Sequence, residues 1–346
     1  MDDHERRIDL VLEGGGVKGI GLVGALAVLE DRGYEPQRIA GTSAGAITAA
    51  LSAAGYKPAE LLDILMKLDF TDFMDEGPED RIPLLGRPLS VWLQQGVFEG
   101  EAFLKWIEEM LAAQGVHTFA DLVYEDTDDV EFRHRLQVIA SDITGGRMLI
   151  LPRDAPAFGV EPDDLPVAEA VRMSMGIPIF FEPWKWNDRL IVDGGVLSNF
   201  PVFLFDAPEG KRRWYTFGLL LAEDLPKSSA GQRIGLAREE KRRGPAIVEF
   251  GKRLVQTMLE AHDRRYVEND SYLRTIMIDT LGVGTTDFSL SEPMRRKLHQ
   301  SGRDAAEKFL DERWDPARFE AVHDAGSSAP SRSELLSQAL PEEPFS

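Results

Sequence analysis

The chain has 346 residues, with 39 Lys and Arg against 59 Asp and Glu, which gives a formal net charge of −20. A protein this acidic repels phosphate backbones, so we expect no nucleic acid partner. The chain has no cysteine, which excludes disulfides, a cysteine nucleophile and thiolate metal sites. The N-terminus has no apolar segment typical of a secretory signal, which favours a cytoplasmic location.

The first 55 residues repeat one pattern twice: a short apolar strand, a glycine-rich turn and a helix. The strands are predicted at 8–13 and 38–40, and the helices at 20–31 and 44–54. Strands that alternate with helices in this way are typical of α/β proteins with a parallel sheet. The sequence therefore predicts the α/β class.

The rest of the chain carries further signals of both kinds. Helices are predicted at 103–111, 167–175, 245–268 and 292–310, and strands at 136–141, 148–151, 189–192, 215–221 and 272–278. No repeat or linker divides these elements, so residues 1–325 are predicted to form one domain. The last stretch, 326–346, is rich in Ser, Pro and Glu and is predicted to be a disordered tail.

A glycine-rich loop separates the first predicted strand from its helix. Its residues are Gly14, Gly15, Gly16, Val17, Lys18 and Gly19. Glycines allow a tight turn that points several N–H groups at one place, and the helix N-terminus behind them favours negative charge. The loop also matches the dinucleotide-binding pattern, but the next strand does not end in the acidic residue that this pattern requires. A plain strand–helix turn is the alternative interpretation.

The turn 41–45 has the sequence Gly-Thr-Ser-Ala-Gly and matches the nucleophile elbow G-x-S-x-G. The small residues Gly41 and Gly45 permit the strained turn that exposes a serine hydroxyl, here that of Ser43. Helix capping is the alternative role for this serine. None of the six histidines lies in a glycine-framed turn or beside a second catalytic group. Neither a histidine base nor a histidine metal site is therefore predicted.

A third motif, Asp193-Gly194-Gly195, follows directly after the predicted strand 189–192. A carboxylate there is expected at the carboxyl end of a strand, where α/β sheets bind their ligands. An ordinary Asp-Gly turn is the alternative interpretation, because this dipeptide is common in turns.

Together the three motifs resemble those of the patatin-like phospholipases, serine lipid acyl hydrolases that use a Ser–Asp dyad without histidine. Two further blocks, 171–183 and 196–201, are similar to the family's segments before and after the aspartate strand. The resemblance covers residues 8–222 well and extends more loosely, through a helical region, to about residue 311. It implies a three-layer α/β/α fold with a mostly parallel central sheet.

The resemblance also implies a chemistry that needs neither a cofactor nor a metal. Ser43 would be the nucleophile, Asp193 the general base, and the loop 14–19 the oxyanion hole, with donors from Gly15, Gly16 and Val17. The implied reaction is hydrolysis of lipid carboxylic esters, of phospholipase A or lysophospholipase type. A general carboxylesterase, a thioesterase and a non-catalytic nucleotide- or lipid-binding protein remain open as alternatives.

The segment 83–98 is rich in apolar residues, Trp92 and Phe98 among them. It predicts a lid or a peripheral membrane contact, with core packing under a long loop as the alternative. Lys18, the one charged residue of the glycine loop, either attracts a phosphate headgroup or points into solvent. A lipid ester is the expected partner, and the sequence does not indicate an oligomeric state.

Overall fold

The structure of the protein, a computed structural model, describes residues 6–69, 73, 100–124, 133–206, 214–222, 257–258, 270–285, 287 and 290–320. Its strands are β1 (Arg7–Leu12), β2 (Glu35–Thr42), β3 (Leu136–Asp142), β4 (Arg147–Leu151), β5 (Trp184–Trp186), β6 (Arg189–Asp193), β7 (Tyr215–Ala222) and β8 (Thr275–Asp279). Its α-helices are α2 (Ile20–Asp31), α3 (Ala44–Ala54), α4 (Pro58–Lys67), α6 (Glu101–Ala112), α7 (Val167–Ser174) and α9 (Glu292–Lys308).

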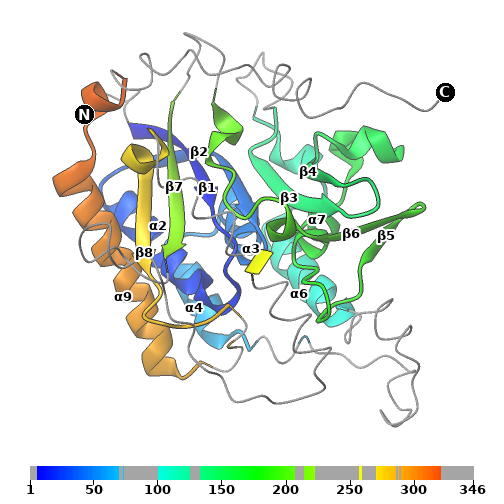
Figure 1. Cartoon of the computed structure of the whole chain (residues 1–346), viewed down its shortest axis with the longest axis horizontal. Coiled ribbons are helices and arrows are strands. Elements are labelled where there is room, and N and C mark those ends of the chain that lie inside the picture. The colour runs from blue at the N-terminus through cyan, green and yellow to red at the C-terminus, as the bar shows by residue number, and fades with distance from the viewer. Residues whose placement is uncertain are drawn as a thin grey trace.

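The strands form one sheet in the order β5-β6-β3-β2-β1-β7-β8, and β4 pairs with β3 off this path. The pairs β1–β2, β1–β7, β2–β3 and β7–β8 are parallel, whereas β3–β4, β3–β6 and β5–β6 are antiparallel. Figure 1 shows α9 beside β8 at one end of the sheet and the antiparallel strands β5 and β6 at the other. The sheet is therefore mixed but mostly parallel, as predicted.

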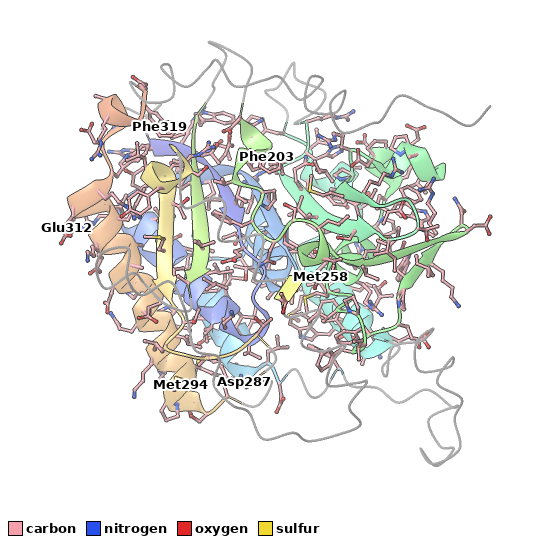
Figure 2. All side chains as sticks on the ribbon, in the orientation of Figure 1. Phe203, Met258, Asp287, Met294, Glu312 and Phe319 are labelled. Atoms are coloured by element: carbon pink, nitrogen blue, oxygen red, sulfur yellow. The ribbon has the colours of Figure 1, made fainter. Side chains whose placement is uncertain are left out.

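Side chains on successive residues of a strand point to opposite faces of the sheet. Leu10 and Leu12 of β1 belong to the larger core cluster, together with apolar residues of α2, α3, α6 and α7. Val11 points to the other face, where it packs with Phe200 and with the short 3₁₀ helix Val202–Phe205. Figure 2 shows the described side chains packed around the strands across the width of the sheet. Helices thus lie on both faces, which confirms the predicted α/β/α class.

Helix α9 packs against α2 at a close approach that only glycine permits. A Cβ added at Gly302 would lie 1.9 Å from the carbonyl oxygen of Gly21, and one at Gly24 would lie 2.0 Å from that of His299. A cross-helix salt bridge, from Arg303 to Asp31 at 2.8 Å, accompanies this contact. The position of α9 relative to α2 therefore depends on small residues in both helices.

Replacing Gly302 by alanine is expected to destabilise the protein by about 1–3 kcal/mol, because the added methyl group overpacks the contact with Gly21. Helix propensity alone predicts the opposite sign, a gain of up to about 1 kcal/mol. Urea unfolding measures the difference, with Gln300→Ala on the exposed face of α9 as the control, expected within about 0.5 kcal/mol of wild type. A stabilised Gly302→Ala variant would contradict the close packing of the two helices.

Most predicted elements are confirmed at closely similar bounds, but some differ. The strand predicted at 38–40 extends over all of β2, and the one at 272–278 was wrong at its start, where Asp270–Arg274 is a 3₁₀ helix. Helix α4 and strand β5 were not predicted. The signal for α4 was Pro58 at its first position, with the Glu60 carboxylate accepting the N–H of Lys57 at 2.8 Å.

Three predictions fall on segments that the structure does not describe. These are the apolar segment 83–98, nearly all of the helix at 245–268 and the tail 326–346. They stay predictions, as does the assignment of residues 1–325 to one domain. In the described part of the chain, no helix is both long and apolar enough to cross a bilayer.

Candidate active site

Ser43 lies in the sharp turn between β2 and α3. Its backbone has φ 53° and ψ −125°, a conformation that L-residues rarely adopt. The turn needs glycine on both sides, because a Cβ at Gly41 would lie 2.3 Å from the carbonyl oxygen of Gly45. A Cβ at Gly45 would in turn lie 2.4 Å from the carbonyl oxygen of Leu12. The strained turn predicted from the G-x-S-x-G pattern is thus present.

The end of α7 holds this turn in place. The backbone N–H of Ser43 donates a hydrogen bond to Ser174 Oγ at 2.8 Å. The Ser43 hydroxyl is directed at Met175 Sδ, 3.6 Å away, and the residue is only 4% exposed. Sequence reasoning noted the block 171–183 but gave Ser174 and Met175 no part in the site. A serine at a helix end carries no signal of which distant backbone it will contact.

The glycine loop lies directly against Ser43. A Cβ added at Gly14 would lie 3.1 Å from Cβ of Ser43. Gly16 has φ +56°, and the 3₁₀ helix Gly16–Gly19 begins there and leads into α2. The N–H groups of Gly15, Gly16 and Val17 donate no hydrogen bond to the part of the chain that the structure describes. The loop that begins next to Ser43 therefore carries three backbone donors without an acceptor in the described part of the chain.

Asn199 fastens the start of the glycine loop. Its side-chain Nδ2 donates to the carbonyl oxygen of Gly14 at 3.0 Å and to Glu13 Oε1 at 3.1 Å, and its backbone carbonyl oxygen accepts the N–H of Gly14 at 3.3 Å. The second carboxylate oxygen of Glu13 accepts the N–H of Leu221 on β7. Sequence reasoning missed Asn199 and Glu13, although the block 196–201 contains the first of them.

The sheet register, not the direction of the strand, brings Asp193 near Ser43. Thr42 pairs with Ile139 on β3, so Ser43 follows at the level of Ala140, and Ala140 pairs with Asp193 on β6. Asp193 is the last residue of β6, as predicted, but β6 runs antiparallel to β3. The aspartate is nevertheless at the site, because the antiparallel strand ends level with Ser43.

Asp193 is completely buried. Its Oδ1 accepts the N–H of Gly195 at 2.8 Å, and its Oδ2 has no hydrogen-bond partner in the described part of the chain. Burial raises the pKa of the Asp193 carboxyl to about 7, although the nearby Ser43 side chain and the hydrogen bond from the Gly195 N–H lower it. At neutral pH this carboxyl is therefore present in both protonation states.

Gly194 lets the chain turn close to the sheet after Asp193. A Cβ at Gly194 would lie 2.3 Å from the carbonyl oxygen of Ile139 and 3.0 Å from the Thr42 side chain. The Ser141 hydroxyl donates to the Gly194 carbonyl oxygen at 3.1 Å. The Asp-Gly-Gly motif thus joins the ends of three strands rather than forming an exposed turn.

A sequence profile of the family described as Patatin-like phospholipase matches residues 10–206. The chain belongs to the patatin-like phospholipase family. The match includes the glycine loop, Ser43 and Asp193. It confirms the predicted resemblance and, with it, the predicted enzyme class of patatin-like carboxylic ester hydrolases.

Relatives of this patatin-like chain occur in bacteria and viruses. Uncharacterized protein YqhO of Bacillus subtilis is 38% identical over 308 residues, which is 88% of this chain and 98% of the relative. Probable lipid hydrolase 463L of Invertebrate iridescent virus 6 is 29% identical over 198 residues, 56% of this chain and 61% of the relative. The crystal structure of VipD from Legionella pneumophila is 19% identical, with a TM-score of 0.49, over 95% of this chain and 73% of that one.

The structure shows where Lys18, the histidines and the potential metal ligands of this patatin-like chain lie. Lys18 is buried, only 5% exposed, so the interpretation that it points into solvent was wrong. Among the described histidines, none is a hydrogen-bond partner of Ser43 or Asp193, and His134 instead contacts Asp163 at 2.7 Å. No group of three or more potential metal ligands occurs in the described ranges.

Proposed function

We propose that the protein is a serine lipid acyl hydrolase, of phospholipase A or lysophospholipase type, that cleaves carboxylic esters through a Ser43–Asp193 dyad. The observation that carries the proposal is the buried Asp193 carboxyl, which interacts with the Ser43 hydroxyl and has a pKa of about 7. A general base works best when its pKa is near the working pH. An exposed aspartate, with a pKa of about 3.9, is a much weaker base.

In the proposed reaction, Ser43 Oγ attacks the ester carbonyl while Asp193 Oδ2 accepts the hydroxyl proton. The tetrahedral intermediate collapses to an acyl-enzyme, and the departing alcohol takes the proton from Asp193. A water molecule then attacks the acyl group, and its proton passes to Asp193. When the fatty acid leaves, Ser43 regains its proton and the dyad returns to its starting state.

The N–H groups of Gly15, Gly16 and Val17, which have no acceptor among the described residues, support the assignment of the glycine loop as the oxyanion hole. The loop that carries them begins at Gly14, next to Ser43, where negative charge develops on the carbonyl oxygen during the proposed attack. The N-terminus of α3, directly after Ser43, adds a favourable dipole. Loss of one such donor typically lowers the rate by about 100- to 1000-fold.

A fluorophosphonate probe, which reacts with activated serine hydroxyls, is expected to label the wild-type protein at Ser43, as identified by peptide mass spectrometry. The protein is also expected to release fatty acid from mixed phospholipid vesicles, and the products identify the ester bond that is cut. No labelling together with no release, from vesicles or from p-nitrophenyl esters, would contradict the proposal.

The same assays separate the alternatives. Faster turnover of acyl thioesters than of oxygen esters would favour a thioesterase, and release only from p-nitrophenyl esters would favour a general carboxylesterase. A melting temperature raised by NAD, NADP or ATP, without hydrolysis, would favour nucleotide binding by the glycine loop.

A further inference from the structure

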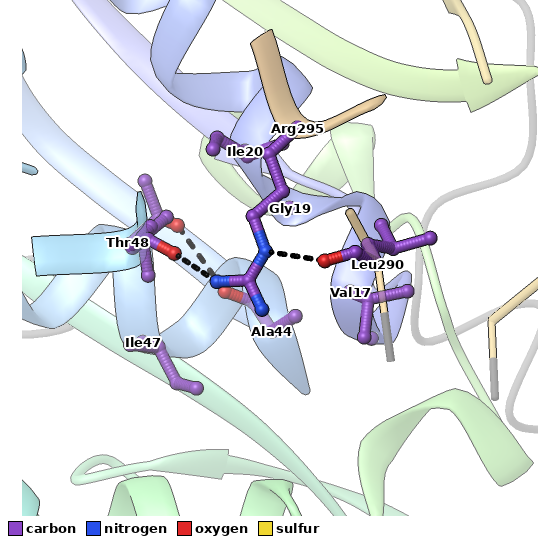
Figure 3. Close-up of a pocket in the computed structure, with 10 residues that line it drawn as sticks. Val17, Gly19, Ile20, Ala44, Ile47, Thr48, Leu290 and Arg295 are labelled. Atoms are coloured by element: carbon purple, nitrogen blue, oxygen red, sulfur yellow. Dashed lines mark hydrogen bonds between the residues drawn. The ribbon is translucent and has the colours of Figure 1, made fainter. Parts of the chain in front are cut away.

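A pocket lies next to the turn at Ser43, where it is lined by the following residue, Ala44. The glycine loop and the first helical turns of α2 and α3 form one part of it, through Gly16, Val17, Gly19, Ile20, Ala44, Ile47 and Thr48. The lining is completed by Leu65 of α4, by Leu290, which precedes α9, and by Arg295 of α9 (Figure 3). The lining is mostly apolar, and Arg295 carries its one charge among the described residues. The pocket thus suits an apolar chain but has a cation in its wall.

The Arg295 guanidinium is held rigidly. Its Nη1 donates to the carbonyl oxygens of Leu65, Met66 and Leu68 at 3.2, 3.0 and 2.6 Å, at the C-terminal end of α4. Its Nε donates to the carbonyl oxygen of Leu290 at 3.2 Å. A cation is stabilised at a helix C-terminus, where backbone carbonyls lack partners. These four bonds keep the side chain from swinging out of the pocket.

One edge of this guanidinium is left over. Nη2 of Arg295 has no hydrogen-bond partner in the part of the chain that the structure describes. Figure 3 shows the guanidinium pointing into the space between Ala44 and Val17. A methylene group placed against this edge would remove water from an N–H donor without replacing the hydrogen bond, which is unfavourable.

We propose that this pocket is the acyl subsite and that Arg295 sets the longest acyl chain that it accepts. The proposal rests on the proposed hydrolase function, because the pocket is assigned to the acyl group of a Ser43 ester. Apolar walls stabilise each methylene that enters them, up to the point where the chain meets Arg295. A longer chain must cover the guanidinium or leave its end in water.

The residues that would set this limit lie outside the matched family segment 10–206. The chain returns to the glycine loop at Thr285, whose carbonyl oxygen would lie 2.1 Å from a Cβ at Gly16. Leu290 and Arg295 then follow, and α9, which carries Arg295, packs against α2 through the glycine contact. The catalytic motifs can therefore be shared with relatives while the acyl preference differs.

The test is the dependence of kcat/KM on acyl length, for p-nitrophenyl esters of two to about sixteen carbons. For wild type, kcat/KM is expected to rise about fourfold per added methylene, then to stop rising at a defined length. In Arg295→Met, which keeps an unbranched side chain without charge, the rise is expected to continue to longer esters. Arg296→Met is the matched control, because Arg296 pairs with Glu292 on the exposed face of the same helix. Its profile should match wild type.

Arg295→Met removes hydrogen bonds to α4 and could unfold the protein, so a second variant provides an independent test. Leu290→Trp fills the pocket from another side. In this variant, kcat/KM is expected to stop rising at a shorter acyl length, and this length is called the break below. Melting temperatures of both variants show whether each is folded. A break at the same length in wild type and in every folded pocket variant would overturn the proposal.

Binding without chemistry distinguishes this inference from the proposed function. Calorimetry with saturated fatty acids of graded length, in the Ser43→Ala background, is expected to show the same break and the same shift in Arg295→Met. If the break in binding shifts but no variant of intact Ser43 hydrolyses any ester, the subsite stands and the hydrolase function fails. If esters are hydrolysed but neither profile responds to Arg295, the hydrolase function stands and the subsite fails.

Discussion

The Ser43→Ala variant is expected to lose ester hydrolysis by at least about 10⁴-fold in kcat/KM, because the acyl-enzyme can no longer form. The change removes only the hydroxyl, which is directed at Met175 Sδ at 3.6 Å and interacts with the Asp193 carboxyl. The backbone bond from Ser43 to Ser174 is unaffected, and alanine meets the same strain at φ 53° as serine does. Folding should therefore be retained, and the loss should appear in kcat rather than in KM.

Ser52→Ala provides the matched control for this experiment. Ser52 lies on the same helix, α3, and its hydroxyl is buried without a hydrogen-bond partner in the described part of the chain. Removing it should leave activity at the wild-type level and should not lower the melting temperature. Equal activity of Ser43→Ala and Ser52→Ala, with both proteins folded, would exclude Ser43 as the nucleophile.

The Asp193→Asn variant is expected to lose activity and to gain stability. An amide cannot accept the serine proton, so kcat should fall by about 10²- to 10⁴-fold. In the wild type, kcat/KM should rise with pH around pH 7, because the pKa of Asp193 is raised to about 7 and only the ionised carboxylate acts as base. A pH–rate profile measures this, and a midpoint near the ordinary aspartate pKa of about 4 would contradict the assignment of the base.

The gain in stability follows from the same pKa. Between about pH 4 and 7 the folded state keeps a proton on Asp193 that the unfolded state has lost, so the stability from this group falls as pH rises. A rise in pKa from 3.8 to about 7, at about 1.4 kcal/mol per unit, makes the ionised form roughly 4 kcal/mol unfavourable. Asp193→Asn removes this penalty. The free energy of unfolding of the variant, measured in urea, should therefore exceed that of the wild type by an amount that grows by about 2–4 kcal/mol from pH 5 to pH 8.

Asp142→Asn is expected to change stability with the opposite sign. Asp142 is as buried as Asp193, but it accepts hydrogen bonds from Arg189 at 2.6 Å and from the Gly145 N–H at 2.8 Å. Burial alone would raise its pKa, yet these bonds hold the pKa below its ordinary value. Removing its charge should therefore destabilise the protein at neutral pH. If both variants changed stability in the same direction, partner contacts would not explain the two pKa shifts.

The local motifs of this chain could be predicted because each depends on short-range geometry. The turn at Ser43 needs small residues on both sides, and the loop before α2 needs glycine where it crosses Thr285. Such requirements depend on consecutive residues, and so do the periodic patterns that predicted β1, α2 and α3. The structure confirms the local geometry of these segments, and their part in catalysis stays a prediction.

The remainder depends on contacts between distant residues, which a single sequence does not reveal. The antiparallel direction of β6 follows from its pairing with β3 and not from its own composition. Asn199 and Ser174 contribute one hydrogen-bonding group each to a backbone more than a hundred positions away. Lys18 was expected in solvent or on a headgroup, but its burial depends on what packs over the loop. Tertiary packing decides all of these.

Strand β8 lies at one edge of the sheet and α9 packs beside it, and this arrangement determines where the chain can be truncated. The family match ends at residue 206, before β7, yet β7 pairs with β1 on one side and with β8 on the other. A chain cut after β7 would present that strand, with its apolar run at Leu219, as an open edge, and would uncover the backbone of α2 at Gly24. Open apolar edges pair with other chains. A fragment that ends after β7 is therefore expected to aggregate, and a shortened version of the protein needs to extend through α9.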